Sequence, residues 1–406
     1  MKITKLGVIF DHKIQSGGGY QQSLNAALIA KELNNQLVEV IFYTTIKKNI
    51  EILKTYEINA KFIELSFFSK LRVYFYRKIK NRYLFNFFRF FEKNNPRENF
   101  FIKDKIDIIY FLSPSTWPID LERTNYITTL WDLCHQDNLE FPEVRFCREF
   151  EKREKNYRLI LARALAVLVD SEFTKVNITG RFGIQEDRVY ITPFRAAVKT
   201  REKLNYKSVC QIDIKKKYNL NFPYIFYPAQ FWAHKNHIYI LKGLIDLKKD
   251  FEIQVGAIFS GADRGNLNFI KEFVAKEGLE DRVRFIGFVS NDEIVKLYSQ
   301  SIALVMPTYF GPTNLPPVEA FEIGVPVLYS DKQGLRDQVG DAALLMDLKD
   351  SKTMATHLKN LIQNNKLRNK LIEEGKKRLK LFDSIDQVSI LKTIINNFIH
   401  KRSCWK

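Results

Sequence analysis

The feature that most constrains the fold of this chain is a repeated pattern of short apolar runs separated by segments of helical length. The runs lack polar alternation, which is typical of parallel strands that are buried on both faces. They form two series: 6–10, 37–43, 106–112, 126–130 and 165–169, then 224–228, 253–259, 283–286, 302–306, 325–329 and 343–346. Two strand–helix series predict an α/β protein with two Rossmann-like, doubly wound domains that face a cleft.

Chain length and one central stretch set the expected domain boundaries. The chain has 406 residues, of which 46% are hydrophobic, so it is long enough to bury two cores. Residues 194–223 are polar and basic and contain no clear strand, so we expect the boundary to lie within them. The expected domains are an N-terminal domain at 1–195, a C-terminal domain at 196–385, and a C-terminal helix and tail at 386–406.

The last segment has the pattern of an amphipathic helix. Its apolar side chains recur at helical spacing and share one face, and they are Val388, Leu391, Ile394, Ile395 and Phe398. A helix with one apolar face must bury that face against another element. We expect this helix to pack back on the N-terminal domain.

Three absences in the sequence limit the class of protein. No stretch of about 20 uncharged apolar residues occurs, so no transmembrane helix is expected. The basic and then apolar N-terminus looks like a signal peptide, but its apolar run is short and meets Asp11, so we expect a buried first strand. The four cysteines form no C-x-x-C pair, which argues against a disulfide framework or zinc site and is consistent with a reducing cytosol.

Basic charge is a marked feature of the composition, with a net charge of +18. That charge is compatible with nucleic acid, anionic membrane and anionic substrates, so its distribution matters. Residues 66–105 carry eleven Lys and Arg against three Asp and Glu, interleaved with Phe and Tyr. Three interpretations stay open: a helix packed by its rings with a solvated basic face, a membrane-interface segment, and a base-stacking surface for nucleic acid.

The strongest local signal is the segment P-T-Y-F-G-P-T-N-L-P-P-V-E-A, which follows one expected strand and precedes another. Its loop contains Gly311 and Thr313 and leads into a helix that starts near Pro316, where proline suits the first turn. The backbone N–H groups near Asn314 and Leu315, together with the helix dipole, are expected to form a phosphate site.

Two charged residues accompany this expected phosphate site. Glu319 is expected in about the first turn of the same helix, where a carboxylate can accept hydrogen bonds from a ribose diol; the alternative is that it only offsets the helix dipole. Lys235 lies in the turn Y-P-A-Q-F-W-A-H-K-N-H, at the carboxyl edge of a parallel sheet, where open α/β folds bind ligands. A lysine there can neutralise a departing diphosphate, although an ordinary surface lysine is the alternative.

Two further motifs follow strands of the first series. Gly18 and Gly19 lie in S-G-G-G-Y after the first strand, and they either let the backbone approach a ligand or make a tight turn. Asp132 and His135 follow the strand at 126–130 and are expected to face the cleft. His135 can hydrogen-bond a sugar hydroxyl or take part in proton transfer, and a structural histidine is the alternative.

The order of these motifs resembles that of glycosyltransferase family 4. The chain has a glycine-rich loop, D-x-x-H, S-E-F-T-K at 171–175, an H-K-N turn and a P-P-x-E-A helix, and G-P-T-N-L-P-P resembles the loop of one branch of the family. The resemblance covers nearly the whole chain except about 48–105. It implies the GT-B fold and a retaining transferase, with Lys235 and His135 as catalytic residues and Gly18, Gly19, Gly311, Thr313, Asn314, Leu315 and Glu319 as residues that bind the nucleotide-sugar.

Two positions depart from the family pattern. Members often carry two glutamates spaced E-x7-E; Glu319 matches the second, and the first position is Gly311 here. Many members also carry an arginine five residues before the lysine, and that position is Gln230 here. The resemblance therefore carries over a ribose contact and one phosphate cation, but not a carboxylate on the donor sugar or a second cation. It implies a diphosphate that leaves through an oxocarbenium-like transition state while Lys235 stabilises the developing charge, with attack from the same face and no protein nucleophile.

Two other functions stay open on the sequence alone. A nucleotide-sugar epimerase can share this architecture but needs positioned carboxylates for proton abstraction, and no convincing set is found. A non-enzymatic basic protein that binds membrane or nucleic acid fits the charge but not the phosphate loop. We expect neither a metal nor a cofactor, because no clustered D-x-D lies beside the phosphate loop, and we expect the nucleotide-sugar to be a co-substrate.

The expected partners follow from the resemblance and from the charge distribution. They are a nucleotide-sugar donor, a saccharide or lipid-linked saccharide acceptor, and an anionic membrane surface bound through residues 66–105, but not nucleic acid. We expect a cytoplasmic enzyme that is peripheral on the cytoplasmic face of a membrane and acts in bacterial cell-envelope polysaccharide synthesis.

Overall fold

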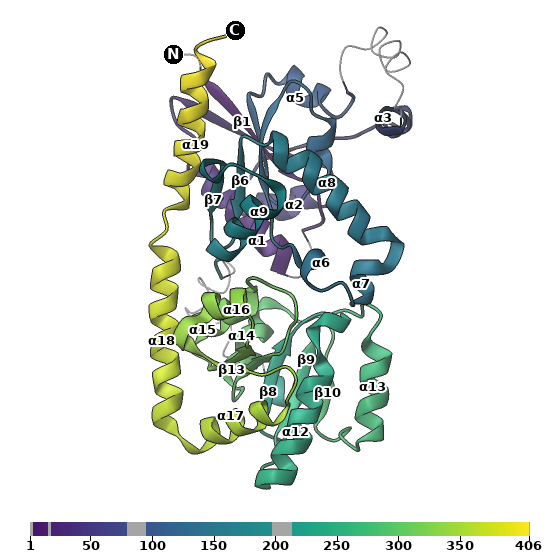
Figure 1. The fold of residues 1–406 in the computed structure, drawn as a ribbon, viewed down its shortest axis with the longest axis vertical. Helices are drawn as coiled ribbons and strands as arrows, with labels where there is room; N and C mark the ends of the chain where they lie inside the picture. Colours follow the sequence, from purple (N-terminus) through teal and green to yellow (C-terminus); the bar gives the residue numbers. More distant parts are fainter. Residues whose placement is uncertain (1–2, 15–17, 79–94, 197–212, 406) are drawn as a thin grey trace. The chain divides into compact units, whose positions relative to one another are not determined.

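The computed structural model describes residues 3–14, 18–78, 95–196 and 213–405. The chain forms two compact units, each with one parallel sheet (Figure 1). Unit 1 combines Met1–Trp131, Glu151–Thr192 and Asp386–Lys406, and unit 2 combines Asp132–Phe150 and Pro193–Ile385. The predicted α/β class with two Rossmann-like sheets is confirmed. Residues 132–150 pack with unit 2, although they fall inside the N-terminal domain expected at 1–195.

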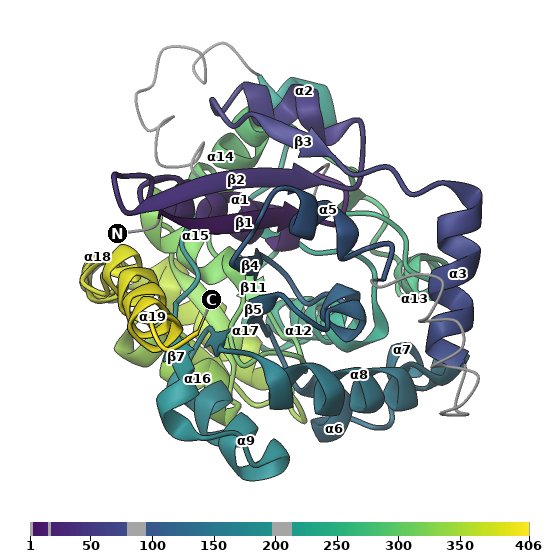
Figure 2. The same cartoon turned by 90° about the horizontal axis from the view of Figure 1, so that it is seen from above.

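The sheet of unit 1 has seven parallel strands in the order β3-β2-β1-β4-β5-β6-β7, and Figure 2 shows β3, β2, β1, β4 and β5 following one another across it. The strand order reverses between β1 and β4, and open α/β sheets place ligands at the carboxyl ends beside such a reversal. The strands are β1 (Thr4–Phe10), β2 (Val38–Thr44), β3 (Ala60–Phe62), β4 (Ile108–Phe111), β5 (Asn125–Thr129), β6 (Ala166–Val169) and β7 (Val189–Ile191).

Two edge strands of this sheet were not predicted. Strands β3 and β7 have three residues each, and neither is fully buried. In β3 the central Lys61 is exposed, so the strand shows no apolar run. An edge strand pairs on one side only, and short, partly polar edges are common because they avoid further pairing.

The helices of unit 1 surround this sheet, but α3 lies to its side in both views (Figures 1 and 2). Along α3, Val73 is buried, while Phe67 and Phe68 are each 74% exposed. The α-helices are α1 (Gly18–Lys31), α2 (Asn49–Lys54), α3 (Phe67–Lys78), α5 (Asn99–Lys103), α8 (Glu149–Arg163), α9 (Glu172–Phe182) and α19 (Gln387–Arg402).

The C-terminal helix α19 packs on unit 1, as predicted. Its side chains Leu391, Ile394, Ile395 and Phe398 are buried in the same core as Leu24 of α1. Arg402 at the end of α19 also forms an ion pair with Asp107, just before β4. The last helix therefore completes the core of a unit whose other elements lie in the first half of the chain.

The sheet of unit 2 has six parallel strands in the order β10-β9-β8-β11-β12-β13, and all six strands of the second predicted series are present. The order reverses between β8 and β11, so this reversal is the place where a ligand site is expected. The strands are β8 (Tyr224–Pro228), β9 (Gly256–Ser260), β10 (Val283–Phe285), β11 (Leu304–Met306), β12 (Val327–Ser330) and β13 (Ala343–Met346).

The helices of unit 2 bury apolar faces against this sheet and against one another. Met354 and Leu358 of α17, for example, are fully buried in the same core as the strands. The α-helices are α6 (Cys134–Asp137), α7 (Pro142–Arg145), α11 (Ile214–Tyr218), α12 (His237–Phe251), α13 (Leu267–Lys276), α14 (Asn291–Ser299), α15 (Leu315–Ile323), α16 (Gln333–Val339), α17 (Lys352–Gln363) and α18 (Asn365–Asp383). Over the described parts of the chain, no helix combines the length and the apolar character needed to cross a bilayer.

Candidate functional site

Lys235 lies at the carboxyl edge of the unit 2 sheet, at the end of the short helix η5 (Ala233–Lys235) that follows β8. Asn236 then adopts a left-handed conformation with φ of 54°, and this turn starts α12. The Lys235 Nζ donates to Asn314 Oδ1 at 3.2 Å and to Thr308 Oγ1 at 3.5 Å. Both acceptors come from the β11–α15 connection, so the ammonium group lies where the strand order reverses.

The electrostatic environment of Lys235 is that of a partly buried cation with weak compensation. Burial lowers the pKa of Lys235 to about 8, against the opposing effect of the Cys134, Asp132 and Glu143 groups. Its two direct partners are neutral oxygen atoms, which offset only part of the lost hydration. An anion at this edge of the sheet would therefore be bound favourably and would raise the pKa of the lysine.

The loop before α15 is held by the side chain of Gln338. Asn314 donates its N–H to Gln338 Oε1 at 2.9 Å, and Gln338 Nε2 donates to the Asn314 carbonyl at 2.6 Å. Asn314 Nδ2 also donates to the Tyr329 hydroxyl at 2.7 Å. The first turn of α15 contains two prolines, which have no N–H. Since the Asn314 N–H already has an acceptor, the expected phosphate site at this helix start is left with fewer backbone donors than the sequence suggested.

Glu319 lies one turn further into α15 and is 6% exposed. Its Oε2 accepts a long hydrogen bond of 3.4 Å from the Tyr298 hydroxyl. Burial raises the pKa of Glu319 to about 7, because one weak hydrogen bond does not replace hydration. The contact with a ribose diol and the offset of the helix dipole both stay predictions for this carboxyl group.

Gly311 is required by packing and leaves no room for a larger side chain. A Cβ at this position would collide with Leu335 of α16. On the other side, the Cys134 thiol donates to the Gly311 carbonyl at 2.6 Å and its sulfur accepts from the Gly311 N–H at 3.3 Å. A glutamate here, as in the E-x7-E pattern, would require the Leu335 side chain to move.

His135 lies in α6 and is fully buried within the described structure. The centroid of its ring is 5.7 Å from the centroid of Phe150. The neighbouring Asp132 accepts from the Cys134 N–H at 2.9 Å and so shapes the start of α6. The structure thus places His135 in the same unit as Lys235, on the segment that contacts the loop at Gly311.

A pair that the sequence analysis missed lies beside Lys235. Glu143 Oε1 accepts the backbone N–H of His234 at 3.0 Å and also bonds to its ring Nδ1. Burial lowers the pKa of His234 to about 4, so the ring is neutral at pH 7 and is assigned as the Nδ1–H donor. Burial alone would raise the pKa of Glu143, but the hydrogen bonds from His234 more than offset it, and the pKa is lowered.

The same histidine is clamped between rings. His234 stacks on Phe310 with centroids 3.9 Å apart and an interplanar angle of 6°, and Phe141 meets both rings edge-on. Lys332 makes a further tie, donating to Asn138 Oδ1 at 3.0 Å and to the Tyr309 carbonyl at 2.9 Å. Residues 132–150 are therefore fixed to the loop after β11 and to the turn that carries Lys235. The partners in these contacts are 91 to 194 positions apart in the sequence, so no local sequence pattern could have predicted the contacts.

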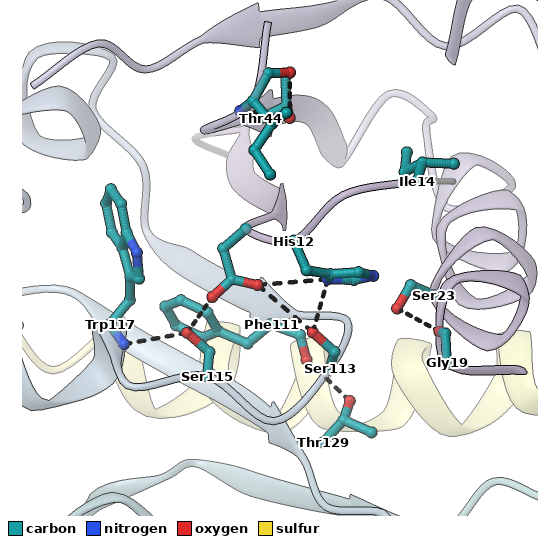
Figure 3. Close-up of polar contacts among 12 residues, drawn as sticks. His12, Ile14, Gly19, Ser23, Thr44, Phe111, Ser113, Ser115, Trp117 and Thr129 are labelled. Atoms are coloured by element: carbon teal, nitrogen blue, oxygen red, sulfur yellow. Dashed lines mark hydrogen bonds and ion pairs between the residues drawn. The ribbon is translucent and has the colours of Figure 1, made fainter. Parts of the chain in front are cut away.

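A second polar cluster lies at the carboxyl ends of β1 and β4 in unit 1 (Figure 3). Asp11 bonds to the Ser115 hydroxyl and, at 3.5 Å, to the Ser113 hydroxyl, which is also 3.1 Å from His12 Nδ1. The His12 Nε2 is buried and has no hydrogen-bond partner among the described residues. The sequence analysis used Asp11 only as the end of a strand and overlooked the serines and His12, which follow two separate strands that meet at the switch point.

The glycine-rich loop is partly described, since residues 15–17 lie outside the described residues. Gly18 and Gly19 begin α1. A Cβ at Gly19 would lie 2.9 Å from the ring of Trp131, so close helix packing already accounts for this glycine. Of the described residues, no group of three or more His, Cys, Asp or Glu side chains is placed to hold a metal ion.

Comparisons with known proteins agree with this architecture. Residues 211–378 match the family model of the glycosyl transferases group 1. The O-antigen chain mannosyltransferase B of Escherichia coli is 25% identical over 287 residues, which are 70% of this chain and 73% of that protein. Similar solved structures include a glycosyltransferase from Rickettsia africae ESF-5, with a TM-score of 0.68, 15% identity and coverage of 98% of this chain and 100% of that chain. Another is HepE from Anabaena in complex with UDP-glucose, with a TM-score of 0.66, 16% identity and coverage of 99% and 100%.

The fold is the GT-B fold of glycosyltransferases. The chain is a glycosyltransferase, an enzyme of the hexosyltransferase class, and the match to the glycosyl transferases group 1 covers most of unit 2. The candidate site around Lys235 lies within the matched residues, apart from its contacts with 132–150.

Proposed function

We propose that this glycosyltransferase moves a hexosyl group, with retention of configuration, from a nucleoside-diphosphate sugar to a saccharide or lipid-linked saccharide of the cell envelope. The observation that carries the proposal is Lys235, a partly buried cation at the switch point of the unit 2 sheet whose hydrogen-bond partners among the described residues are neutral. Such a cation matches the negative charge that develops on a departing diphosphate.

The other residues of the site are assigned roles around that diphosphate. Glu319 would accept hydrogen bonds from the ribose hydroxyls, which would lower its raised pKa by favouring the ionised form. The Leu315 N–H and the Thr313 region of the loop would meet the phosphate, since α15 begins there. His135, on the segment that holds this loop, would hydrogen-bond a sugar hydroxyl or take part in proton transfer. We propose that Lys235 takes the place of a metal ion and that no cofactor is needed.

The acceptor is proposed to meet unit 1. The cluster of Asp11, His12 and Ser113 offers a carboxylate, an imidazole nitrogen without a partner and a hydroxyl at the carboxyl edge of the sheet, which suits binding of sugar hydroxyl groups. The Escherichia coli relative is an O-antigen chain mannosyltransferase, which supports a cell-envelope acceptor. His12→Ala should raise KM for the acceptor without changing donor affinity.

Association with a membrane is also part of the proposal. The exposed rings of Phe67 and Phe68 on α3, among basic residues, fit the headgroup region of an anionic bilayer. Residues 79–94 of the basic segment lie outside the described residues, and α3 is the part of the segment that carries these exposed rings. The enzyme would then be peripheral on the cytoplasmic face of the membrane.

The test begins with ligand binding and ends with product analysis. Thermal unfolding with UDP, GDP, ADP and dTDP should show stabilisation by one base, about 2.7 kcal/mol at one hundred times the dissociation constant. The matching hexose donors should then be hydrolysed or transferred, in the presence of EDTA as well, and NMR of the product should show the donor's anomeric configuration. Epimerised nucleotide-sugar without release of nucleotide, or binding of nucleic acid in place of nucleotides, would contradict the proposal.

A further inference from the structure

The loop after β9 brings an arginine next to the turn that carries Lys235. Strands β8 and β9 are neighbours, with Pro228 in register with Ser260, so the chain leaves both strands at the same edge of the sheet. The two loops are then joined by backbone hydrogen bonds, from the Phe231 N–H to the Ala262 carbonyl at 3.0 Å and from the Asn266 N–H to the Phe231 carbonyl at 3.3 Å.

The arginine loop is exposed at residues 263–265 and is shaped by local hydrogen bonds. The Asp263 carboxylate accepts from the N–H groups of Gly265 and Leu267, at 2.7 and 3.3 Å, and these bonds close a tight turn around Arg264. Gly261 allows the loop to approach β8, because a Cβ there would collide with the Ala229 carbonyl oxygen. The backbone of Arg264 is therefore held in place by contacts that do not involve its side chain.

The guanidinium group of Arg264 is aimed by Gln230. Gln230 Oε1 accepts from Arg264 Nε and from Trp232 Nε1, both at 3.1 Å. The guanidinium carbon also lies 5.6 Å from the centroid of the Trp232 ring. These contacts use Nε and one face of the group, and the two Nη amino groups have no hydrogen-bond partner within the described ranges. A planar fork with two unused amino groups suits a phosphate oxygen pair.

One short turn therefore connects two cations. The Lys235 N–H donates to the Trp232 carbonyl at 3.2 Å, so the residue that packs on Arg264 also belongs to the turn of Lys235. A nucleoside-diphosphate sugar carries one negative charge on each of its two phosphates. Lys235 matches one of these charges, and the position from which the family arginine would match the other is occupied by Gln230.

We propose that Arg264, oriented by Gln230, is the second cation that binds the diphosphate of the nucleotide-sugar. The second cation would then come from the loop after β9 and not from the end of β8, and Gln230 at the end of β8 would orient it. This inference rests on the proposed function and assigns Arg264 as a binding residue and Gln230 as a positioning residue for it.

The test measures the affinity of nucleoside diphosphate and of the uncharged nucleoside by NMR titration, using the base selected by the thermal-shift panel. Arg264→Gln should weaken binding of the diphosphate roughly tenfold or more and should leave the nucleoside unchanged, since the lost contact is a charge-assisted hydrogen bond to phosphate. Gln230→Ala keeps the cation but removes its orientation, so it should weaken diphosphate binding by a smaller factor.

Two further variants separate position from charge. The double variant Gln230→Arg/Arg264→Gln returns the cation to the end of β8 and should recover most of the lost affinity. Arg282→Gln removes the same charge at the amino end of β10, whereas Arg264 lies beyond the carboxyl end of β9. This control should change the affinity less than twofold.

Each outcome decides the matter. Diphosphate affinity within twofold of wild type in folded Arg264→Gln overturns the inference and leaves the proposed function standing. Equal weakening of nucleoside and diphosphate also overturns it, because Arg264 would then serve the base. Wild-type protein that binds none of the four nucleoside diphosphates would overturn both the inference and the proposed function.

Discussion

At the scale of single residues, burial shifts the pKa values of both Lys235 and Glu319 toward neutral pH, in each case against the charged form. Burial lowers the pKa of Lys235 to about 8 and raises that of Glu319 to about 7. In each case the charged form is the one that a nucleoside diphosphate would favour, through phosphate at the lysine and ribose hydroxyls at the glutamate. Ligand binding should therefore take up a proton at Lys235 and release one from Glu319.

Lys235→Ala should lower turnover on the order of 100-fold, because an electrostatic contact to the leaving group is lost. The fold should be retained, since the ammonium group is costly to bury and its direct partners are neutral. Steady-state kinetics with the preferred donor measures the first effect and urea unfolding the second. Lys242→Ala, an exposed position on α12, is the matched control. Wild-type turnover without Lys235 would remove it from the catalytic site.

The raised pKa of Glu319 predicts a pH dependence of stability. Because the folded-state pKa is about 7 and the ordinary value is 4.5, the contribution to stability is fully present below pH 4.5 and is lost as pH rises through 7. At pH 8 the loss amounts to roughly 3 kcal/mol, from about 1.4 kcal/mol per unit. Glu319→Gln, which stays neutral, should therefore be more stable than wild type at pH 8 but not at pH 5.

Urea unfolding of both proteins at the two pH values measures this difference. The same variant should weaken binding of nucleoside diphosphate by calorimetry, because glutamine is a poorer acceptor for two ribose hydroxyls. An equal stability difference at pH 5 and pH 8 would mean that Glu319 is ionised at both and that its burial is less complete than the structure shows.

Sequence reasoning reached these residues for a definite reason. Lys235 lies in the turn after β8, and Glu319 lies in the helix that follows the loop after β11, so a local strand–loop–helix pattern places both near the carboxyl edge of a parallel sheet. The same reasoning did not foresee that the Asn314 N–H is already bonded to Gln338, 24 positions away, or that Trp131 packs against Gly19. Partners of backbone donors and the packing of glycines depend on tertiary contacts that a local pattern does not contain.

At the scale of elements, the segment 132–150 acts as a brace for the loops of unit 2. Cys134 is bonded to Gly311, Asn138 to Lys332, and Glu143 to His234. Each of these three hydrogen-bonded contacts involves a residue of unit 2 that follows the carboxyl end of a strand. The segment therefore fixes the turn of Lys235 and the loop before α15 relative to each other.

Glu143→Ala should loosen this brace. The substitution leaves the buried N–H and Nδ1–H of His234 without their acceptor, so the free energy of unfolding should fall by about 2 kcal/mol. Donor affinity should fall as well, because Lys235 follows His234 directly. Glu143→Gln keeps an acceptor, so it should lose less free energy of unfolding and less donor affinity than Glu143→Ala.

The measurements are urea unfolding and titration with nucleoside diphosphate. Glu140→Ala, at an exposed position three residues earlier, should have neither effect. Full donor affinity in a destabilised Glu143→Ala protein would show that the clamp supports the fold but not the position of Lys235.

Elements differ in how well the sequence predicts them. All six strands of unit 2 were predicted, with shifts of a few residues at the ends, because the four central strands are apolar and almost fully buried, while the edge strands β10 and β13 are partly exposed. Strand β3 was missed because its sequence, A-K-F, is not an apolar run, and β7 was missed because its apolar run, V-Y-I, has only three residues. The packing of 132–150 with unit 2 was missed because its partners come from distant strands, while its own residues follow β5 directly.

At the scale of the whole molecule, the exposed rings of α3 are the described feature that bears on the membrane. Replacing Phe67, Phe68 and Leu71 with serine should reduce co-sedimentation with anionic vesicles at low salt, because burying one such ring contributes about 1.5–3 kcal/mol. Wild type should sediment less with neutral vesicles and less at high salt, since basic residues contribute about 1 kcal/mol each near an anionic surface.

Phe269→Ser supplies the control, because this ring is 56% exposed on α13 of unit 2 and lies outside the basic segment. Its sedimentation should equal that of wild type. A wild-type protein that stays in the supernatant with every vesicle would leave α3 as a packing or acceptor element without a role at the membrane.

The position of α19 has a consequence for how the protein is made. Unit 1 needs the buried side chains of α19, yet about 190 residues of other structure are translated between Thr192 and this helix. At 5–20 residues per second, unit 1 waits roughly 10–40 s with the α1 side of its core uncovered. A chain stopped after Ile385 should therefore be cut by protease in unit 1 but not in unit 2, and adding a peptide of residues 386–406 should restore protection. All residues of unit 2 are therefore translated before unit 1 receives its last helix, so unit 2 can complete its fold first.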